Sequence, residues 1–333
     1  MTQQSQSKYR NGPENRIESK DITFVIQGPI FPDITVSSIH SLRRLFPSSP
    51  IILSTWEGSD THELDVDVVL LNQDPGTTVI GYRQDDSPMC ININRQLRST
   101  LSGLRQVKTQ YAVKLRSDNI INDSRFVDEF FNYPKRNEQY SIFNQRIVTS
   151  TFYAKEQTKG ISIPYFMSDF FHFGLTEDLL TLWDIEEFLP FLYDKEKKGQ
   201  RQHWQSPNRL LHTEQIMWSK CLSKFFDVAL VDEYGQSKDI EKSYQYMINN
   251  LILLDNEHSL NLSVQPRLEQ PNPFPYEFIS QTRWTWLYQQ EFNVTSSIGY
   301  LFKLKWYLAR VLKFGHKGIV NSIKTATIRY KTR

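Results

Sequence analysis

The sequence predicts an α/β protein with a single open, mostly parallel sheet and helices on both of its faces. Between residues 21 and 120, short β-branched and aromatic runs alternate with stretches of helical periodicity, and the runs end in polar turn signals. Such alternation is typical of parallel strands joined by crossover helices. With 333 residues, 39% of them hydrophobic, the chain is long enough to bury a substantial core.

The expected strands of the first half are four runs, residues 22–26, 51–56, 66–71 and 111–115. Helices are expected between them, because apolar residues recur at helical spacing in residues 35–46 and 92–107. After residue 120 the pattern weakens. It predicts, in order, a helix at 125–132, strands at 141–149 and 165–173, a helix at 176–183 and another beginning near His212.

Composition divides the chain into four segments. Residues 1–20 have almost no apolar periodicity and predict a disordered tail, whereas residues 21–260 form the α/β domain. A cluster of prolines predicts an extended connector at 261–297. Residues 298–333 predict a basic amphipathic helical tail, in which one face carries Leu301, Leu304, Leu308 and Val311.

The formal net charge of +2 is the sum of an acidic part and a basic part of the chain, whose charges largely cancel. Residues 294–333 hold nine basic side chains and no acidic one, so the remaining 30 basic and 37 acidic side chains give residues 1–293 a net charge of −7. The basic tail, with Trp306 and Tyr307 suited to a membrane interface, is expected to bind anionic inner-leaflet lipid at about 1 kcal/mol per nearby basic group. The alternative is a helix packed on the domain with a solvated basic face. Nucleic acid is not an expected partner, because the rest of the chain is acidic.

Missing motifs exclude several classes of protein. The sequence contains no GxGxxG, GxxxxGK[ST], HExxH or GxSxG, so it lacks a dinucleotide fingerprint, a P-loop, a zincin site and a nucleophile elbow. The two cysteines, Cys90 and Cys221, are too few for a disulfide framework. No apolar run is long enough to span a membrane and the N-terminus lacks a hydrophobic signal region, so we expect a cytoplasmic protein.

Polar, turn-forming segments follow the four expected strands. In an open parallel sheet, the carboxyl ends of the strands form the edge where ligands bind, and four such ends suit a nucleotide-sized ligand. Turns themselves also favour Gly, Pro and Asp, and for residues 74–76 we prefer that explanation. The segments are Gln27-Gly28-Pro29, Thr55-Trp56-Glu57-Gly58, Asp74-Pro75-Gly76 and Arg116-Ser117-Asp118-Asn119.

Residues 116–119 carry the most chemistry. The Asp118 carboxylate, beside the Ser117 hydroxyl and the Asn119 amide, offers hard oxygen ligands to Mg²⁺ or Mn²⁺. Such a metal would bridge a diphosphate and neutralise charge on a leaving group, and Arg116 can add a bidentate phosphate contact. An Asx turn capped by Asn119 explains the same four residues equally well.

Other polar residues fit either a ligand site or an ordinary structural role. Asn92, Asn94 and Arg95 lie at the expected start of a helix, where free N–H groups favour anions, although N-capping alone explains the asparagines. Asp169 lies in a very aromatic strand, where its burial is costly unless it is paired or binds a ligand; a surface position is the alternative. Glu214 lies in the first turn of a helix, either as a routine helix start or as a base that deprotonates a hydroxyl.

In this order, these segments resemble the WavE lipopolysaccharide-synthesis family. The resemblance spans about residues 21–220 and is carried by residues 22–29, 52–58, 92–96, 114–119 and 168–174. It implies a GT-A-type glycosyltransferase that adds a sugar to a growing bacterial surface polysaccharide, whether lipopolysaccharide core, O-antigen or capsule. The implied partners are a nucleotide-sugar donor and a lipid-linked or oligosaccharide acceptor, at the inner face of the bacterial inner membrane.

The resemblance also implies roles for individual residues. In GT-A enzymes a D-x-D motif after the fourth strand binds the donor ribose and a divalent metal, and Arg116-Ser117-Asp118 stands in its place here. Asp118 is therefore the implied ligand of Mg²⁺ or Mn²⁺, while Arg116 replaces the first acid and can hold phosphate directly. The implied catalytic base is Glu214 or Asp169. The implied donor-binding residues are Gln27, Gly28, Glu57, Asn92, Asn94, Arg95, Arg116, Ser117 and Asn119.

Two other classes of function stay open. A nucleotidyltransferase of sugar-nucleotide metabolism would share a nucleotide-binding α/β sheet, but residues 27–30 are a poor version of the glycine-rich basic loop that such enzymes carry after the first strand. A non-catalytic, membrane-associated scaffold of polysaccharide assembly is the second alternative. Binding of a nucleoside diphosphate would separate the scaffold from either enzyme.

Overall fold

The computed structural model describes residues 17–82, 85, 87–158, 160–188, 212–230, 237–266, 277–316, 318–320, 322–323 and 326. Most of the expected N-terminal tail, three of the connector prolines and much of the basic tail lie outside this range. The division of the chain into four segments therefore stays a prediction.

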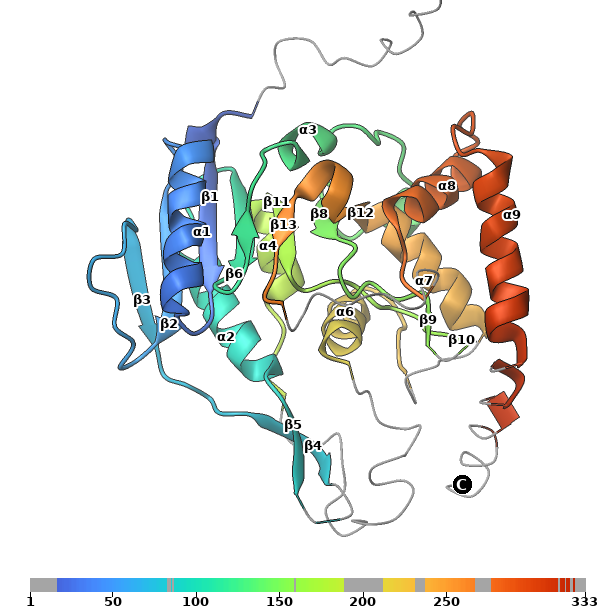
Figure 1. Ribbon diagram of the computed structural model, residues 1–333, viewed down its shortest axis with the longest axis horizontal. Coiled ribbons are helices and arrows are strands. Elements are labelled where there is room, and N and C mark those ends of the chain that lie inside the picture. Colours follow the sequence, from blue (N-terminus) through green and yellow to red (C-terminus); the bar gives the residue numbers. More distant parts are fainter. Residues whose placement is uncertain are drawn as a thin grey trace, which may run out of the picture.

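A seven-stranded sheet forms the centre of the protein (Figure 1). Its order is β12-β8-β11-β6-β1-β2-β3. Neighbouring strands are parallel except at β11, which is antiparallel to both β6 and β8, so the other six strands all point the same way. The strands are β1 (Ile22–Gln27), β2 (Ile51–Trp56), β3 (Val68–Asn72), β6 (Tyr111–Arg116), β8 (Ile147–Ser150), β11 (Phe171–Leu175) and β12 (Leu251–Leu254).

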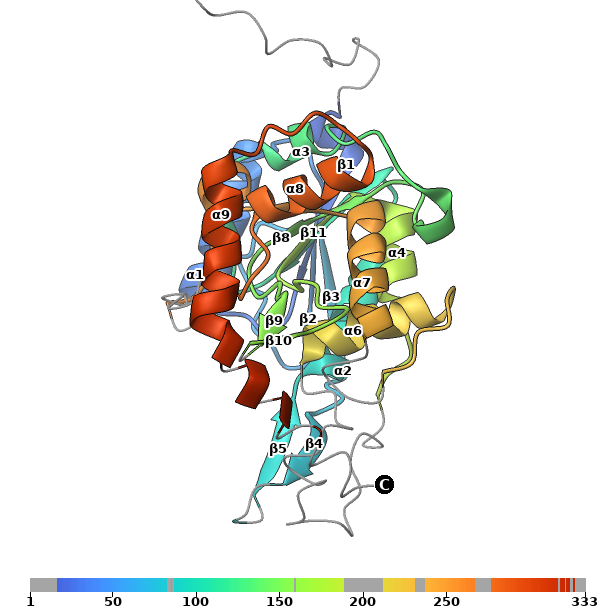
Figure 2. The ribbon, with the colours of Figure 1, turned by 90° about the vertical axis from the view of Figure 1, so that its right-hand side faces the viewer.

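Helices cover both faces of this sheet, which confirms the expected mixed α/β class. α1 and α9 lie on one side, and α2, α4 and α7 lie on the other (Figure 2). The helices are α1 (Pro32–Leu45), α2 (Ile93–Leu104), α3 (Phe126–Glu129), α4 (Thr176–Trp183), α6 (Thr213–Ser223), α7 (Ser237–Asn250), α8 (Gln281–Glu291) and α9 (Tyr300–Leu308). No helix in the described ranges is long and apolar enough to cross a membrane.

The central strand β1 shows why both faces are covered. All six of its residues are buried, so the strand reads as a continuous apolar run without the alternation of a half-exposed strand. Helix α2 packs directly on it, and a methyl group at Gly103 would collide with the Val25 side chain. A glycine inside a helix destabilises the helix by about 1 kcal/mol relative to alanine. The close approach of α2 to β1 explains why a glycine nevertheless occupies this position.

Three two-stranded sheets accompany the main one, in place of the single sheet expected from the sequence. They pair β4 (Thr78–Tyr82) with β5 (Pro88–Ile91), β7 (Ile120–Ile121) with β13 (Leu262–Ser263), and β9 (Gln157–Thr158) with β10 (Ile161–Ser162). The β4–β5 hairpin projects from the body at the end where β1 and β2 finish (Figure 1). The sequence analysis missed it because its strands lack the alternating apolar pattern on which strand prediction depends.

Several element boundaries differ from those expected. The aromatic strand expected at 165–173 begins only at Phe171, and Tyr165, with a φ of +55°, does not have a strand conformation. The strand expected at 141–149 is β8, which runs from Ile147 to Ser150. Within 261–297, where an extended connector was expected, residues 281–291 form the helix α8, whose N-cap Ser280 accepts a hydrogen bond from the backbone N–H of Arg283.

Candidate functional site

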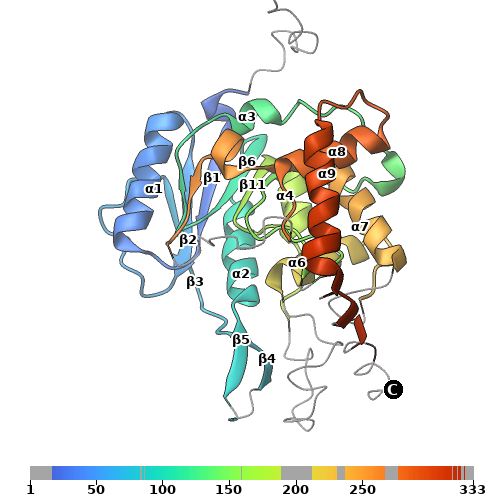
Figure 3. The ribbon, with the colours of Figure 1, turned by 45° about the vertical axis from the view of Figure 1, so that its right-hand side comes forward.

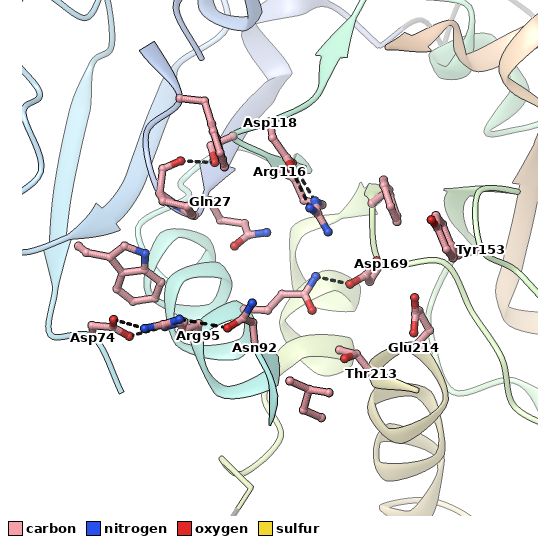
Figure 4. A pocket seen from close by; sticks show the side chains of 18 residues that line it. Gln27, Asp74, Asn92, Arg95, Arg116, Asp118, Tyr153, Asp169, Thr213 and Glu214 are labelled. Atoms are coloured by element: carbon pink, nitrogen blue, oxygen red, sulfur yellow. Dashed lines mark hydrogen bonds and ion pairs between the residues drawn. The ribbon is translucent and has the colours of Figure 1, made fainter. Parts of the chain in front are cut away.

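A cavity of about 630 Å³ lies at the carboxyl ends of β1, β2 and β6, beside the N-termini of α2 and α6 (Figure 4). This is the sheet edge at which the sequence placed a ligand. The residues that line it are Gln27, Gly28, Pro29, Phe31, Trp56, Asp74, Ile91, Asn92, Arg95, Gln96, Arg116, Ser117, Asp118, Tyr153, Asp169, Phe170, Thr213 and Glu214. Of the twelve residues assigned to the site from the sequence, nine are in this set, and Glu57, Asn94 and Asn119 are not. The roles of all twelve stay predictions.

The floor of the pocket joins the ends of β1 and β6. The backbone N–H of Ser117 donates to the carbonyl of Gln27 at 2.9 Å, and the Ser117 hydroxyl donates to the carbonyl of Pro29 at 2.6 Å. Gly28 has a φ of +117°, and a Cβ there would lie 2.9 Å from the Ser117 hydroxyl oxygen. Gly28 and Ser117 therefore allow the two strand ends to approach closely, and Gln27 is held by a hydrogen bond from Ser99 at 2.8 Å.

Arg116 and Asp118 form a bidentate ion pair inside the pocket. Nε of Arg116 donates to Oδ1 of Asp118 at 2.8 Å, and Nη2 donates to Oδ2 at 2.7 Å. Nη1 takes part in neither bond. The guanidinium also lies 4.7 Å above the Phe170 ring. Burial disfavours the charged guanidinium, but the hydrogen bonds to Asp118 and the charge of Asp169 outweigh it and raise the pKa of Arg116.

This pairing bears on the metal expected at Asp118. Both carboxylate oxygens of Asp118 already accept hydrogen bonds from Arg116, and Asp118 is only 3% exposed. Within the described ranges, no three His, Cys, Asp or Glu side chains are grouped so that they could hold a metal ion. A divalent cation at Asp118 would have to displace the Arg116 guanidinium, but Mg²⁺ needs only one or two protein carboxylates besides phosphate and water, so the metal at Asp118 stays a prediction.

Arg95 is held by a second bidentate pair, on the other wall of the pocket. It donates to the two carboxylate oxygens of Asp74 at 2.7 and 2.6 Å and to the side-chain oxygen of Asn92 at 3.1 Å. The hydrogen bond from Arg95 lowers the pKa of Asp74. Asp74 also accepts a hydrogen bond from the backbone N–H of Gly76, so the turn role preferred from the sequence is confirmed. The same side chain also lines the pocket, at the sheet edge where the sequence placed residues 74–76.

Asp169 has one satisfied and one unsatisfied carboxylate oxygen. Oδ2 accepts a hydrogen bond from Gln96 at 2.6 Å, whereas Oδ1 is buried and has no hydrogen-bond partner among the described residues. The backbone carbonyl of Asp169 accepts a hydrogen bond from the ammonium of Lys114, which is fully buried in β6 and whose pKa burial lowers to about 7. A buried carboxylate oxygen without a partner is costly, and a ligand hydroxyl in the pocket would satisfy it.

Glu214 begins helix α6 and faces the same pocket as Asp169 (Figure 4). Burial, and then the negative charge of Asp169, raise the pKa of Glu214 to about 8. The two carboxylates therefore differ in their chemistry. Glu214 therefore stays protonated up to about neutral pH. Its ionised form binds a proton far more tightly than the carboxylate of an ordinary glutamate does.

An aromatic wall completes the pocket. Tyr153 and Phe170 stack with their ring centroids 5.3 Å apart and their planes at 5° to each other. Tyr153 has a φ of +56°, which a bulky residue rarely adopts. Trp56, at the end of β2, also lines the cavity. Tyr153 lies in a turn with no sequence motif, so only the folded chain reveals its place.

The three expected site residues outside the lining have other partners. Glu57 is exposed, and its backbone N–H donates to the carbonyl of Asn72 at 2.9 Å. The Asn94 amide exchanges hydrogen bonds with the backbone N–H and carbonyl of Phe188, both at 2.6 Å. Asn119 is fully buried and donates to the carbonyl of Phe170 at 3.4 Å. Asn94 and Asn119 thus support chain segments near the pocket.

Comparisons with known proteins give a family and several distant structural likenesses, two of which follow. A search of curated proteins finds no relative of this chain. The crystal structure of S. aureus TarS matches with a TM-score of 0.32 and 12% identity over 60% of this chain and 33% of TarS, so the chain spans about a third of the TarS length. HddC from Yersinia pseudotuberculosis matches with a TM-score of 0.30 and 8% identity, over 50% of this chain and 82% of HddC. These scores support no inference.

The family match is much more extensive. The family model described as WavE lipopolysaccharide synthesis matches residues 22–317, which include every strand of the central sheet and every residue that lines the pocket. The chain belongs to the WavE lipopolysaccharide synthesis family.

Proposed function

We propose that this protein is a glycosyltransferase that moves a sugar from a nucleotide-sugar donor to a growing bacterial surface polysaccharide. The observation that carries the proposal is the pocket itself, which presents the Arg116 guanidinium and two buried carboxylates, Asp169 and Glu214, at the carboxyl edge of a parallel sheet. A cation for a diphosphate and a base for a hydroxyl are the two groups that sugar transfer requires. Membership of the WavE family and the GT-A-like order of the motifs support the same reaction.

The donor side of the pocket is formed by Gln27, Gly28 and the guanidinium of Arg116. Arg116 keeps one nitrogen, Nη1, outside its ion pair with Asp118, and that nitrogen is suited to donate to a phosphate oxygen. Asp118 fixes the plane of the guanidinium before the ligand arrives. In this proposal Arg116 stabilises the negative charge that develops on the departing diphosphate, as a positioned cation in a partly desolvated site does.

The acceptor side is formed by Glu214 and Asp169. The Glu214 carboxylate accepts the proton of an acceptor hydroxyl while the hydroxyl oxygen forms its bond to the anomeric carbon. The bond from that carbon to the diphosphate breaks, and the diphosphate leaves with the electron pair. Asp169 orients the hydroxyl through its unsatisfied Oδ1 and raises the basicity of Glu214 by its charge. A single displacement of this kind inverts the anomeric configuration.

Arg116 is tested by comparison with a second arginine in a bidentate pair. Arg98 binds Glu187 at 2.6 and 2.7 Å but lies outside the pocket lining, so Arg98→Gln is a matched control for Arg116→Gln. We expect thermal shift to find a nucleotide sugar, among UDP-, GDP-, dTDP- and CMP-linked candidates, that stabilises the native protein and Arg98→Gln but not Arg116→Gln.

The same experiment separates the alternatives. No stabilisation of the native protein by any nucleotide sugar or nucleoside diphosphate would contradict the proposal and favour a non-catalytic scaffold. Stabilisation accompanied by release of pyrophosphate from a nucleoside triphosphate and a sugar phosphate would instead identify a nucleotidyltransferase. Equal loss of binding in both arginine variants would show that Arg116 has no special role.

A further inference from the structure

The outer face of the C-terminal helix is apolar and exposed. Helix α9 continues into the helical turns of residues 309–314 (η7), and together they present one apolar side to solvent. We call this side the outer stripe; its members, 37% to 70% exposed, are Leu301, Leu304, Leu308, Val311 and Leu312. Residues three, four and seven apart lie on one side of a helix, so these five form a continuous ridge. Ile319 and Ile323, further along the chain, are exposed as well.

The opposite face of the same helix is packed on the body of the protein. Trp306 and Phe302 contact Trp286 of α8 with ring centroids 5.5 and 6.5 Å apart, and Ala309 is buried. The helix thus has two apolar sides, of which only the inner one is covered by the domain. A helix that merely packed on the domain would need apolar residues on that inner side alone.

A buried ion cluster fixes the helix in this orientation. Arg310 of η7 and Arg283 of α8 each bring Nη2 to 2.9 Å from Oε1 of Glu156, and the Tyr244 hydroxyl donates to the same oxygen at 2.7 Å. Both guanidinium groups also lie over the Trp306 ring, at 4.5 and 4.1 Å. Arg310, one of the nine basic side chains of residues 294–333, turns inward. The inward turn of Arg310 holds the outer stripe pointing away from the body.

The charge of this segment indicates what covers the stripe. Residues 294–333 carry nine basic side chains and no acidic one, whereas residues 1–293 carry a net charge of −7. An anionic surface therefore attracts this end of the molecule and repels the rest. Tyr300 and Tyr307, which are 77% and 54% exposed, flank the stripe and have the apolar ring and polar hydroxyl that suit the headgroup region of a bilayer.

We propose that the outer stripe is a docking surface for a bilayer that contains anionic phospholipid. The helix lies in the interface, with Leu304, Leu308 and Leu312 among the acyl chains and the basic residues at the headgroups. The docked helix stays close to the pocket, because Glu156, which it binds, follows the pocket-lining Tyr153 by three residues. The end of α9 also points towards the same end of the molecule as the β4–β5 hairpin and the start of α2 (Figure 3). The idea that docking gives the pocket access to a lipid-linked acceptor rests on the proposed function. The docking of the stripe on a bilayer does not depend on that function.

The test compares two double substitutions in the full-length protein. Leu304→Glu with Leu308→Glu alters the stripe, and Val69→Glu with Leu71→Glu is a matched control on β3, since all four side chains are 37% to 52% exposed and both variants add the same charge. The probe is vesicles of phosphatidylcholine with phosphatidylglycerol. We expect the wild type and the control to co-sediment with them, and the partition coefficient of the stripe variant to fall at least tenfold. Pure phosphatidylcholine vesicles should bind the wild type more weakly.

Three outcomes would overturn the proposal. The stripe variant might sediment with vesicles as the wild type does, or both double variants might lose binding equally. Alternatively, analytical ultracentrifugation might show a wild-type dimer that the stripe variant abolishes while neither binds vesicles, in which case a second copy covers the stripe. Nucleotide-sugar binding in thermal shift should be the same for the stripe variant and the wild type, so a failure of docking and a failure of the proposed function are distinguishable.

Discussion

Two buried glutamates of this protein have pKa values that are shifted in opposite directions. Glu156 lies under the C-terminal helix, and although burial opposes its charge, Arg283 and Arg310 outweigh burial and lower its pKa. Glu214 lies at the pocket, where burial and the neighbouring charge of Asp169 raise its pKa. The charged form of the same side chain is thus favoured in one place and disfavoured in the other. Neighbouring charges decide which, since burial acts in the same direction on both.

The difference has a structural counterpart. Oε1 of Glu156 accepts hydrogen bonds from Arg283 and Tyr244 and forms an ion pair with Arg310, so this carboxylate joins α7, α8 and the helical turns that follow α9. Glu214 instead faces a cavity that already contains an unsatisfied oxygen of Asp169. The charge of Glu156 is compensated by two arginines, whereas Glu214 shares its pocket with a second carboxylate. An acid with a raised pKa in a cavity is typical of functional sites.

The largest effect is expected from removing the proton acceptor. Glu214→Gln keeps the shape of the side chain but cannot take a proton, so we expect sugar transfer to fall by about 10²–10⁴-fold. The measurement is the turnover number with a donor identified by thermal shift, and donor binding should be unchanged. Glu156→Gln is the control, since it is assayed in the same way and should retain turnover at temperatures where it stays folded. If the two variants lost activity equally, the functional distinction between the glutamates would be wrong.

The reverse comparison concerns stability. Glu156→Gln leaves Arg283 and Arg310 as uncompensated cations in a buried cluster, which costs about 3–5 kcal/mol of the free energy of unfolding. Urea denaturation of the purified protein would measure this loss at neutral pH. Glu214→Gln should be no less stable than the wild type under the same conditions, because it removes a group that is costly to ionise. An unfolding free energy of Glu156→Gln equal to that of the wild type would show that the cluster does not anchor the helix.

Opposite pH dependences of stability follow from the two pKa shifts. The pKa of Glu156 is lowered in the folded state, so its contribution is present above the unfolded pKa and is lost as the pH falls through the folded value. The pKa of Glu214 is raised, so its contribution is largest at low pH and is lost as the pH rises towards about 8. Between pH 5 and 9 we therefore expect Glu214→Gln to lose less stability with rising pH than the wild type. Parallel curves would contradict the raised pKa.

A smaller shift should appear in the pH profile of activity. The charge of Asp169 helps to raise the pKa of Glu214, so Asp169→Asn should lower that pKa and move the rising limb of kcat/KM to lower pH. The proton acceptor is active in its ionised form, which is why the limb rises with pH. A reduced turnover without any displacement of the limb would mean that Asp169 acts only by binding the acceptor.

The smallest effect is expected from chelation. Arg116 occupies both oxygens of Asp118, so we expect donor binding and transfer to be unchanged within about twofold when EDTA replaces Mg²⁺ or Mn²⁺. Isothermal titration with the donor, with and without the chelator, measures this directly. A large loss of affinity on chelation would mean that the ion pair opens to admit a metal and that Asp118 is a metal ligand after all.

The sequence predicted the framework more reliably than the site. Strands β1, β2, β3 and β6 were expected within two residues of their observed ends, because β-branched runs bounded by turn residues are local signals. Strand β11 was located less well, because Tyr165 bends the aromatic segment away from strand geometry. The position of the pocket followed from the parallel sheet, since the carboxyl ends of parallel strands meet at one edge.

Individual site residues were harder to predict, because neighbours in sequence face different ways. Glu57 was expected in the pocket, but the adjacent Trp56 lines it. Asn94 and Asp169 both lie in segments chosen from the sequence, yet only Asp169 faces the cavity. His172, in the same aromatic segment as Asp169, is fully buried and faces the core instead, with its ring nitrogens hydrogen-bonded to the Ser168 carbonyl and the Trp183 indole.

The sequence by itself determined the α/β class, the sheet edge where the pocket lies, the family resemblance and the separation of an acidic body from a basic end. These features depend on local residue patterns and on sums over the composition of each segment, both of which can be read without knowing the fold. Only the tertiary structure decided that Arg116 neutralises Asp118, that Arg310 turns inward to Glu156, and that Glu214 and Glu156 have opposite pKa shifts. Those outcomes depend on side-chain orientation, on the distances between charges and on burial in the folded chain, and electrostatic energies depend on these distances and on burial.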